Sequence, residues 1–445
     1  MEHKFTKNFP EMEILPLTSR VNQGRLSIGG CDLHSLAEEF GTPLYIYDEE
    51  TIRLICKDFI REFSHCYEDV KIEYSTKAFS NPSINRIIDE ERLNIDVVTG
   101  GELAVAIASN FPANRINFHG NNKSEHELIE AIEYGIETIT IDSFYEIFLL
   151  DKILKSKSKK QKVMIRVSPS IDPHTHLLTT TGILDSKFGF SIETGDAEKA
   201  ISQIMKLDSF DLLGVHFHLG SPIFELDPYQ QAIDYVITFS SRMRDLYGLN
   251  LRKFSPGGGF AIGYVANELP PKISDYARII SESVKKGCDK YKFDYPELIV
   301  EPGRAIVGRS GVAIYSVGAI KEIPKVRTYV SVDGGMGDNI RPAIYGSEYS
   351  VIPVGKINDK WDNKVTVSGK FCESGDILAR DVFLPELRSG DLLALPSSGA
   401  YCIGMSSNYN MQVRPAVVLV NNGVPKLIKR RETYKDLLET SLNID

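Results

Sequence analysis

The segment Lys71-Ile-Glu-Tyr-Ser-Thr-Lys-Ala78 is a short β-type run that ends near a lysine and gives way to a turn. Burying an unpaired ammonium at the end of a strand costs free energy, so a lysine at position 77 calls for a structural or chemical explanation. A partly desolvated lysine loses its proton readily and can form a Schiff base with an aldehyde cofactor. Most strand-end lysines have only a structural role, so a chemical role for Lys77 is supported only by the similar segments later in the chain.

Eight β-type runs follow one another from Lys71 onward, and helical patterns such as 82–91, 101–108, 125–134 and 143–154 lie between them. The first runs are spaced by about 20 to 25 residues, the length of a compact βα unit. Alternating strands and helices predict parallel pairing, and eight units predict a closed (β/α)8 barrel. The predicted strands are Lys71–Ser75, Leu93–Val98, Arg115–Phe118, Thr138–Ile141, Val163–Val167, Leu212–Phe217, Lys253–Ser255 and Glu297–Val300.

Polar residues gather at the carboxyl ends of these runs, where barrels of this kind keep their chemistry. An open parallel sheet would place functional groups at the same edge, so the pattern locates the site more firmly than it fixes closure. The residues are Lys77, Asp96, His119, Asp142, Arg166, His218 with Ser221, Gly257–Gly259, and Glu301 with Arg304.

After about Arg309 helical periodicity nearly disappears and β-type runs dominate. This change predicts a separate β domain, and the β-like run Arg25–Ile28 suggests that the N-terminal segment joins it. We therefore divide the 445 residues into an N-terminal segment (1–44) that joins the β domain, a cofactor-binding barrel (45–309), and a β domain with active-site loops (310–445).

Composition excludes several classes of protein. The net charge of −9 argues against nucleic acid or an anionic membrane as a main partner. No apolar stretch approaches the ~20 residues of a membrane span. The six cysteines are scattered without the pairing of a metal site, so we expect reduced thiols, no metal and a cytoplasmic location.

Two motifs after the last predicted strands suit a phosphorylated heteroaromatic cofactor. The three glycines of Ser255-Pro-Gly-Gly-Gly-Phe260 let main-chain N–H groups approach a phosphate, although a tight turn needs glycines too. Ser221 could donate to the same phosphate. Glu301 could face a ring nitrogen and keep a pyridinium protonated, the alternative being a plain salt bridge to Arg304. His218 could lie against the ring, although a lone histidine is more often a packed core residue.

Three segments of the β domain carry side chains with suitable chemistry. Cys372 is a candidate proton donor, and Glu373 a candidate partner for an ammonium group. Tyr401 could donate to a phosphate or a carboxylate, and Arg341 with Tyr345 suits a carboxylate. Each residue alone has an ordinary explanation, such as a buried cysteine, a turn, or a surface arginine beside a packed tyrosine.

With these motifs assembled, the chain resembles the fold-type III pyridoxal-phosphate decarboxylases, and among them the diaminopimelate decarboxylase family. The resemblance extends from Leu36–Tyr47 to about Val420. It rests on Tyr74–Ala78, Asp96–Leu103, Phe118–Lys123, His174–His176, Lys187–Gly189, His218–Ser221, Gly257–Gly259, Glu301–Arg304, Cys372–Asp376 and Gly399–Asn410.

The resemblance implies an alanine-racemase-like barrel that binds pyridoxal 5'-phosphate. Lys77 would hold the cofactor as a Schiff base, Glu301 would pair with the pyridine nitrogen, and His218 would stack on the ring. Cys372 or Lys77 would return a proton to the substrate after carbon dioxide leaves. The other implied residues are Asp96, Ser221, Gly257, Gly258, Gly259, Gly303, Arg304 and Tyr401 for the cofactor, and Arg304, Arg341, Tyr345, Glu373 and Tyr401 for the far end of the substrate.

The resemblance also implies a homodimer, because the Cys372–Glu373 loop of this family enters the active site of the opposite subunit. The expected reaction converts meso-diaminopimelate to L-lysine and carbon dioxide, in lysine biosynthesis. Glu301 favours decarboxylation, since racemases of this fold typically place an arginine at the ring nitrogen.

Departures from the family pattern leave other interpretations open. Gln412, Val413 and Val417 stand where the family usually has arginine, proline and glutamate, and Ser168-Pro-Ser170 replaces Asn-Pro-Gly. A related enzyme of an antibiotic or siderophore pathway, acting on another amino acid that is free or bound to a carrier protein, is therefore an alternative. A catalytically inactive regulatory homologue is disfavoured because it would usually lose the Schiff-base lysine or the acid. A cofactor-carrying homeostasis protein would lack the β domain.

Overall fold

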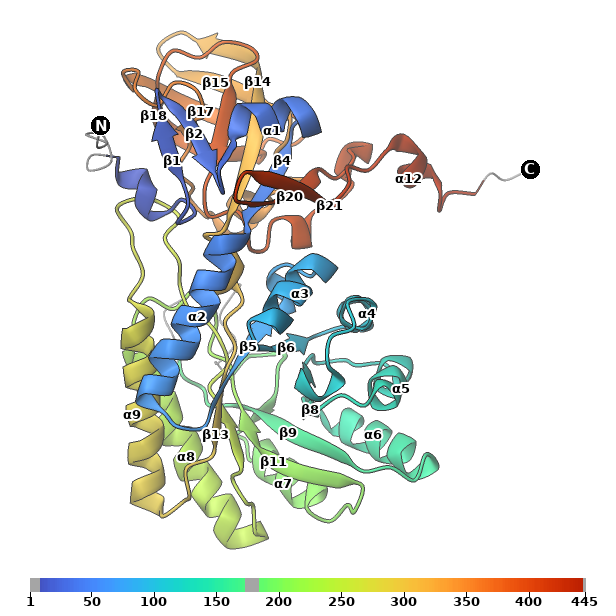
Figure 1. The fold of residues 1–445 in the computed structure, drawn as a ribbon. Coiled ribbons are helices and arrows are strands. Elements are labelled where there is room, and N and C mark those ends of the chain that lie inside the picture. The colour runs from blue at the N-terminus through green and yellow to red at the C-terminus, as the bar shows by residue number, and fades with distance from the viewer. Residues whose placement is uncertain (1–8, 173–183, 443–445) are drawn as a thin grey trace. The chain divides into compact units, whose positions relative to one another are not determined.

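Residues 9–172 and 184–442 are described by the computed structural model, and the chain divides into two units that are each drawn in Figure 1. The barrel unit consists of residues Ile55–Ala261 and Pro271–Gly303. The β unit consists of Met1–Leu54, Ile262–Pro270 and Arg304–Asp445. Each unit therefore combines segments that are far apart in the sequence.

The barrel unit is built on eight parallel strands that close into a ring. The pairing of β13 with β5, which joins Leu298 to Val70, closes it. In ring order the strands are β5 (Val70–Ser75), β6 (Asn94–Val97), β7 (Ile116–Phe118), β8 (Thr138–Ile141), β9 (Gln161–Ser168), β11 (Phe210–His216), β12 (Lys253–Ser255) and β13 (Glu297–Val300); β10 (Phe190–Ser191) pairs with β9 only. The predicted (β/α)8 barrel is confirmed, and all eight predicted strands overlap observed ones.

Helices cover the outside of this ring, as Figure 1 shows. Four of them begin with a side-chain cap, because Asn81, Thr99, Ser124 and Ser143 each accept a hydrogen bond from the first turn of the helix. Such caps start the helix soon after the strand ends, which keeps the loops at this edge short. The helices are α3 (Pro82–Glu90), α4 (Gly100–Ala108), α5 (Glu125–Tyr134), α6 (Phe144–Ser156), α7 (Asp196–Ile204), α8 (Asp227–Tyr247) and α9 (Ile273–Tyr291), preceded by α2 (Glu49–Cys66).

The β unit is organised around the long strand β14 (Gly311–Ile323). It pairs antiparallel with β4 (Leu44–Asp48), and β4 pairs in parallel with β20 (Ala416–Asn421). Strand β4 therefore belongs to this sheet, although the sequence-based division begins the barrel at residue 45. The remaining strands are β15 (Arg327–Val332), β16 (Ile352–Pro353), β17 (Asn363–Ser368), β18 (Ile377–Leu384), β19 (Leu392–Leu395) and β21 (Val424–Lys429), with a small sheet of β1 (Arg20–Asn22), β2 (Arg25–Ile28) and β3 (Cys31–Asp32).

The core of the β unit mixes residues from both ends of the chain. Leu26 and Ile46 are fully buried together with Ile314 and Val418. Strand β18 was not predicted, because Asp381 adopts a φ of 55° within it and its pairing with β17 shifts register. Among the described helices, none has the length and apolar character that crossing a membrane requires. Four short helices complete the described part of the unit: α1 (Leu33–Phe40), α10 (Arg304–Val307), α11 (Arg341–Tyr345) and α12 (Tyr434–Leu438).

Candidate active site

Glu301 follows β13 directly and is buried, with 6% of its surface exposed. Its Oε1 accepts a hydrogen bond from Ser255 Oγ at 2.7 Å, and its Oε2 lies 3.1 Å from His216 Nε2. Burial alone would raise the pKa of Glu301, but His216, His119 and the Ser255 hydroxyl hold that pKa well below its usual range. The carboxylate is therefore ionised at neutral pH.

Two histidines surround this carboxylate. The rings of His119 and His216 meet edge to face with centroids 4.7 Å apart, and His119 Nε2 is 3.9 Å from Glu301 Oε1. An ionised carboxylate only accepts, so His216 must carry a proton on Nε2. Burial lowers the pKa of His119 well below its usual value, against the opposing effect of the nearby Glu301 charge.

His218 lies against the glycine loop that follows β12. Its Nδ1 accepts a hydrogen bond from the Gly258 N–H at 3.2 Å. Burial lowers the pKa of His218 well below its usual value, and an accepting Nδ1 fits a neutral ring with its proton on Nε2. A Cβ on Gly257, whose φ is 75°, would lie 2.6 Å from the Phe217 carbonyl oxygen. Only glycine fits there.

Lys77 lies in the 3-10 turn Thr76–Ala78, directly after β5. The strand ends at Ser75, as predicted, and residue 77 is exposed while Thr76 and Ala78 are buried, so the role of Lys77 stays a prediction. Burial raises the pKa of the neighbouring Asp96 to about 7, against the opposing effect of the Lys77 charge. Ser75 Oγ donates to Asp96 Oδ2, so the carboxyl is held beside this turn.

The remaining predicted residues of the barrel unit are packed against the same strand ends. A Cβ on Gly303 would lie 2.9 Å from Ser75 Cβ, so glycine allows this close approach next to the Lys77 turn. Ser221 is half-buried and follows Gly220, whose carbonyl oxygen would lie 2.6 Å from a Cβ on Gly259. The structure thus brings the predicted barrel residues to one end of the ring.

The β unit carries its predicted residues on three loops, 333–345, 369–376 and 399–414, which we call the loop cluster. Asp376 connects two of them, since its carboxylate accepts from the Met336 N–H at 2.6 Å and from the Phe371 N–H at 2.8 Å. Asn410 connects the third, because its Oδ1 accepts from the Cys372 N–H at 2.9 Å. Cys372 and Glu373 are both exposed.

Arg341 is buried within this cluster, which overturns the plainer interpretation of a surface arginine. Its Nε donates to Tyr349 Oη at 2.9 Å and its Nη2 to Ser347 Oγ at 3.1 Å. The guanidinium lies 4.9 Å from the ring centre of Tyr264 and 5.8 Å from that of Tyr345. These hydroxyl groups and aromatic rings hold the Arg341 guanidinium in one orientation.

Arg304 and Tyr401 also meet in the β unit. The Arg304 guanidinium lies 4.8 Å from the ring centre of Tyr401 and donates to the hydroxyl of Tyr264. Tyr401 has a φ of 59°, a conformation that a tyrosine adopts only where its surroundings hold it. The salt bridge considered for Glu301 and Arg304 does not describe their contacts, since Glu301 bonds to His216 and Ser255.

Comparison with known proteins decides the family. The family model for the pyridoxal-dependent decarboxylases, pyridoxal binding domain, matches residues 53–308. Diaminopimelate decarboxylase of Bacillus subtilis is 45% identical over 426 residues, covering 96% of this chain and 97% of that protein. The crystal structure of the M. jannaschii diaminopimelate decarboxylase in complex with L-lysine matches with a TM-score of 0.90 at 35% identity, covering 96% and 98% of the two chains.

The chain belongs to the diaminopimelate decarboxylase family. A further relative, the diaminopimelate decarboxylase of Synechocystis, is 42% identical over 439 residues and covers 96% of this chain and 93% of that protein. The expected resemblance and the alanine-racemase-like fold are therefore confirmed. The motif His174–His176 lies outside the described residues, whereas Gly189 of the Lys187–Gly189 motif donates its N–H to Asp142 Oδ1 at 2.8 Å.

Pyridoxal 5'-phosphate, the cofactor of this family, fits the residues of the barrel unit. An ionised, buried Glu301 suits a protonated ring nitrogen, and the glycine loop leaves no room for side chains beside its main-chain N–H groups. Asp96 Oδ1 is buried and has no hydrogen-bond partner among the described residues, as expected of a group with an outside partner.

A metal ion is the other ligand that this group could hold. The ligand atoms of His119, His216 and Glu301 all lie within 4.8 Å of one another. Both oxygens of the Glu301 carboxylate, however, already have hydrogen-bonding neighbours, Ser255 at Oε1 and His216 at Oε2, and these fix its orientation. The sequence-based expectation of no metal stays a prediction.

Sequence reasoning missed two residues that complete these groups, His216 and Tyr264, and named His119 at a strand end without a specific role. A buried acid at the end of β13 demands donors from neighbouring strands, which could have pointed to His216. Tyr264 lies in the segment Ile262–Pro270, which belongs to the β unit. Nothing in its local pattern signals that it lies near two arginines, Arg304 at 5.8 Å and Arg341 at 4.9 Å.

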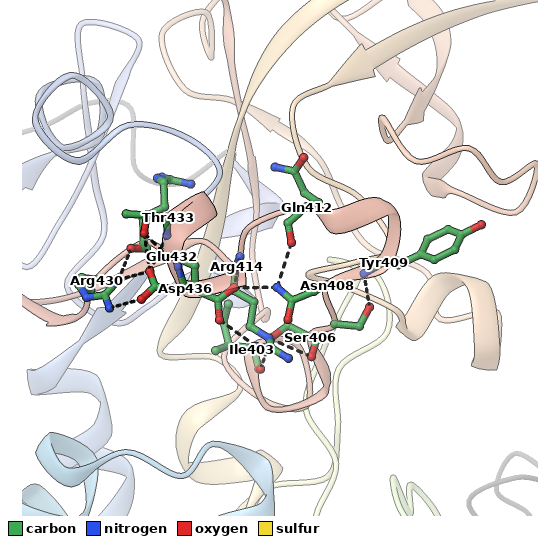
Figure 2. Close-up of polar contacts among 12 residues, drawn as sticks. Ile403, Ser406, Asn408, Tyr409, Gln412, Arg414, Arg430, Glu432, Thr433 and Asp436 are labelled. Atoms are coloured by element: carbon green, nitrogen blue, oxygen red, sulfur yellow. Dashed lines mark hydrogen bonds and ion pairs between the residues drawn. The ribbon is translucent and has the colours of Figure 1, made fainter. Parts of the chain in front are cut away.

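One departure from the family pattern has a structural explanation. Val417 is fully buried in β20 between β4 and β21, so it contributes to the packing of the β unit. Gln412 accepts from Asn408 Nδ2 at 3.0 Å through its main-chain carbonyl (Figure 2), a contact that does not depend on the side chain.

Proposed function

We propose that the chain is a pyridoxal 5'-phosphate-dependent carboxy-lyase that converts meso-diaminopimelate to L-lysine and carbon dioxide in lysine biosynthesis. The observation that carries this proposal is the buried, ionised Glu301 between Ser255 and His216, in a chain of the diaminopimelate decarboxylase family. The L-lysine bound in the structures of the M. jannaschii and Helicobacter pylori enzymes supports the expected product.

The barrel residues would hold the cofactor and set its charge. Lys77 would bind it covalently through Nζ, and the main-chain N–H groups of Gly257–Gly259 with Ser221 would bind its phosphate. Pyridoxal phosphate, when bound, supplies an electron sink for the electron pair left by the departing carboxylate. Glu301 would keep the ring nitrogen protonated, which a neutral residue could not do. Asp96, His218, Gly303, Arg304 and Tyr401 complete the proposed cofactor set.

Neutral His218 suits the face of a cationic ring. Its Nδ1 is occupied by the Gly258 N–H, so the ring has a fixed orientation. A protonated imidazole beside a protonated pyridine would repel it. Burial lowers the pKa of His218 and so keeps the imidazole uncharged. A positive charge there would counteract the effect of Glu301 on the ring nitrogen.

The loop cluster would bind the far end of the substrate. Arg341 with Tyr345, and Arg304 with Tyr401, offer positive and hydrogen-bonding groups for a distal carboxylate, and Glu373 offers a partner for a distal ammonium. Cys372 or Lys77 would return the proton to the α-carbon. The buried setting of Arg341 supports a binding role, since a buried guanidinium needs an acceptor or a π-face in each direction.

We further propose a homodimer in which the Cys372–Glu373 loop serves the site of the partner subunit. The exposure of both residues on a loop that is otherwise well tied supports this assignment. The six cysteines are free thiols, which suits the reducing cytoplasm that we propose as its location.

The test is carbon dioxide release from meso-diaminopimelate, L-lysine, L-ornithine, L-arginine and a carrier-bound glutamate. We expect rapid turnover of diaminopimelate alone. Turnover of another substrate without diaminopimelate would replace the substrate and favour the pathway alternative that Gln412, Val413 and Val417 raised. Borohydride reduction followed by peptide mapping should label Lys77, and a label elsewhere would refute the cofactor assignment.

A further inference from the structure

The last described segment of the β unit is bonded to the loop that carries Tyr401 and Asn410 (Figure 2). Glu432 Oε2 accepts from Asn408 Nδ2 at 2.7 Å and from the Arg414 main-chain N–H at 2.8 Å, while Oε1 accepts from Arg414 Nη1 at 2.8 Å. The Glu432 N–H also donates to the Arg414 carbonyl at 3.1 Å. Glu432 thus bonds through both carboxylate oxygens and its amide to two residues of one loop.

Those two residues enclose a tight turn. Asn408 Nδ2 also donates to the Gln412 carbonyl at 3.0 Å, and the Met411 N–H donates to the Asn408 carbonyl at 2.9 Å. Asn410 lies in the middle of this turn with a φ of 52° and a ψ of 27°, in the left-handed region. A non-glycine residue holds that conformation only where the surroundings fix it, and Glu432 supplies part of the fixing.

The turn is in direct contact with the Cys372 loop. Asn410 Oδ1 accepts from the Cys372 N–H at 2.9 Å. The ring of Tyr409 stacks on that of Phe371, with centroids 6.1 Å apart and planes 13° from parallel. The main chain at Cys372 is therefore set by the turn, and the turn is anchored by Glu432.

The charge of Glu432 strengthens this anchor. Burial alone would raise the pKa of Glu432, but its hydrogen bonds from Arg414 and Asn408 hold the pKa below its usual range. The ionised carboxylate accepts charge-assisted hydrogen bonds, which are stronger than neutral ones. A glutamine at this position would keep the shape but not the charge, and its NH2 group would face at least one donor, either Arg414 Nη1 or the pair formed by Asn408 Nδ2 and the Arg414 N–H.

We propose that Glu432 is a positioning residue for Cys372, acting through Asn408, Arg414 and the turn that presents Asn410. The proposal rests on the proposed function, since Cys372 affects the reaction only as the group that returns the proton. Glu432 itself need not touch substrate or cofactor.

The chain provides a matched control four residues further on. Asp436 accepts from the Thr433 N–H at 2.7 Å and from Thr433 Oγ1 at 2.8 Å, and its Oδ1 accepts from Arg430 Nη2 at 2.7 Å. These bonds cap α12 within its own segment. Glu432→Gln and Asp436→Asn therefore remove one charge each from the same segment, but only Glu432 is hydrogen-bonded to the loop 399–414.

The experiment compares both variants with the wild-type holoenzyme by three measurements. These are amide hydrogen exchange of the peptide containing Cys372, the rate of Cys372 alkylation by iodoacetamide mapped by mass spectrometry, and kcat and KM for carbon dioxide release. For Glu432→Gln we expect faster exchange, an altered alkylation rate, and a kcat lower by about 10- to 100-fold with KM changed less than about threefold. Asp436→Asn should leave all three unchanged.

Equal exchange and alkylation in the two variants would overturn the proposal. Should Glu432→Gln fail to fold, Asn410→Gly removes only the last link, and glycine accepts the φ of 52° without strain. Normal exchange at Cys372 in Asn410→Gly would then refute the link. If the wild-type enzyme decarboxylates none of the candidate substrates, the proposed function fails, while exchange and alkylation still decide the role of Glu432.

Discussion

In the barrel unit the proposed site residues lie at the ends of the barrel strands, whereas in the β unit such residues lie on three loops that are hydrogen-bonded to one another. Glu301 takes its place from β13 and is oriented by Ser255 of β12 and His216 of β11. Cys372, in contrast, is placed by the side chain of Asn410. Barrel geometry thus fixes the first group, and side-chain hydrogen bonds to main-chain N–H groups fix the second.

This contrast teaches where single substitutions should act. In the barrel unit a substitution should remove one chemical function and leave its neighbours in place, because the strands are paired on both sides. In the loop cluster a substitution should move several groups together, because each loop depends on the others. Substitutions in the two units therefore test whether this difference holds.

The largest effect should come from Lys77→Ala. Loss of the covalent attachment should lower kcat/KM by about 10⁴-fold or more, measured by carbon dioxide release. Lys71→Ala, near the start of the same strand and also exposed, should keep wild-type activity. Similar losses in both variants would mean that the strand, and not the amine of Lys77, matters.

Glu301→Gln should lower kcat by about 10²- to 10³-fold, because the charge that would hold the ring nitrogen protonated is lost, and should also lower stability, because the depressed pKa of Glu301 means that the fold favours the ionised form. The matched control is Glu297→Gln at the opposite end of β13, where Glu297 pairs with Lys253 at 2.9 Å. Wild-type kcat in Glu301→Gln would contradict the assignment of the reaction to an ionised acid. Thermal unfolding of both variants separates chemistry from folding.

Asp376→Asn, in the loop cluster, should lower both stability and activity. An asparagine cannot accept from both the Met336 and the Phe371 N–H groups, so we expect about 1–3 kcal/mol lower stability together with about tenfold lower kcat. Urea unfolding and carbon dioxide release measure the two losses. Asp381→Asn, on the exposed part of β18, should change neither by much. A loss of stability without a loss of activity would separate Asp376 from the proposed site.

The same contrast explains how much the sequence could predict. Each barrel strand leaves a local signal, an apolar run with a polar residue at its end, so Lys77, Asp96, His218 and Glu301 could be placed at strand ends without a structure. The exposure of Lys77 could not, because it depends on the 3-10 turn Thr76–Ala78 that follows the predicted end of the strand at Ser75. The loop cluster has no period, and Arg341 is typical of a surface residue until Tyr349 and Tyr264 are seen around it.

A pH-dependent effect is expected at Asp338, which supports the loop that leads to Arg341. Tyr315 Oη donates to its Oδ1 at 2.5 Å, Tyr45 Oη to the same atom at 3.0 Å, and the Gly335 N–H to Oδ2 at 3.0 Å. Burial outweighs these bonds and raises the pKa of Asp338 to about 6. A pKa that is raised on folding favours the protonated form, so the stability it contributes is complete below the unfolded pKa and is lost as the pH rises through about 6.

From this sign, the free energy of unfolding of the wild type should fall between about pH 4 and pH 6 by up to about 3 kcal/mol from Asp338 alone. Asp338→Asn cannot ionise and should lack this part of the pH dependence, which urea unfolding at a series of pH values would measure as a difference between the two proteins. Identical pH dependence in both would mean that Asp338 keeps an ordinary pKa. Since the β unit holds its groups through such buried acids, a rise in pH should loosen the loop cluster before it affects the barrel.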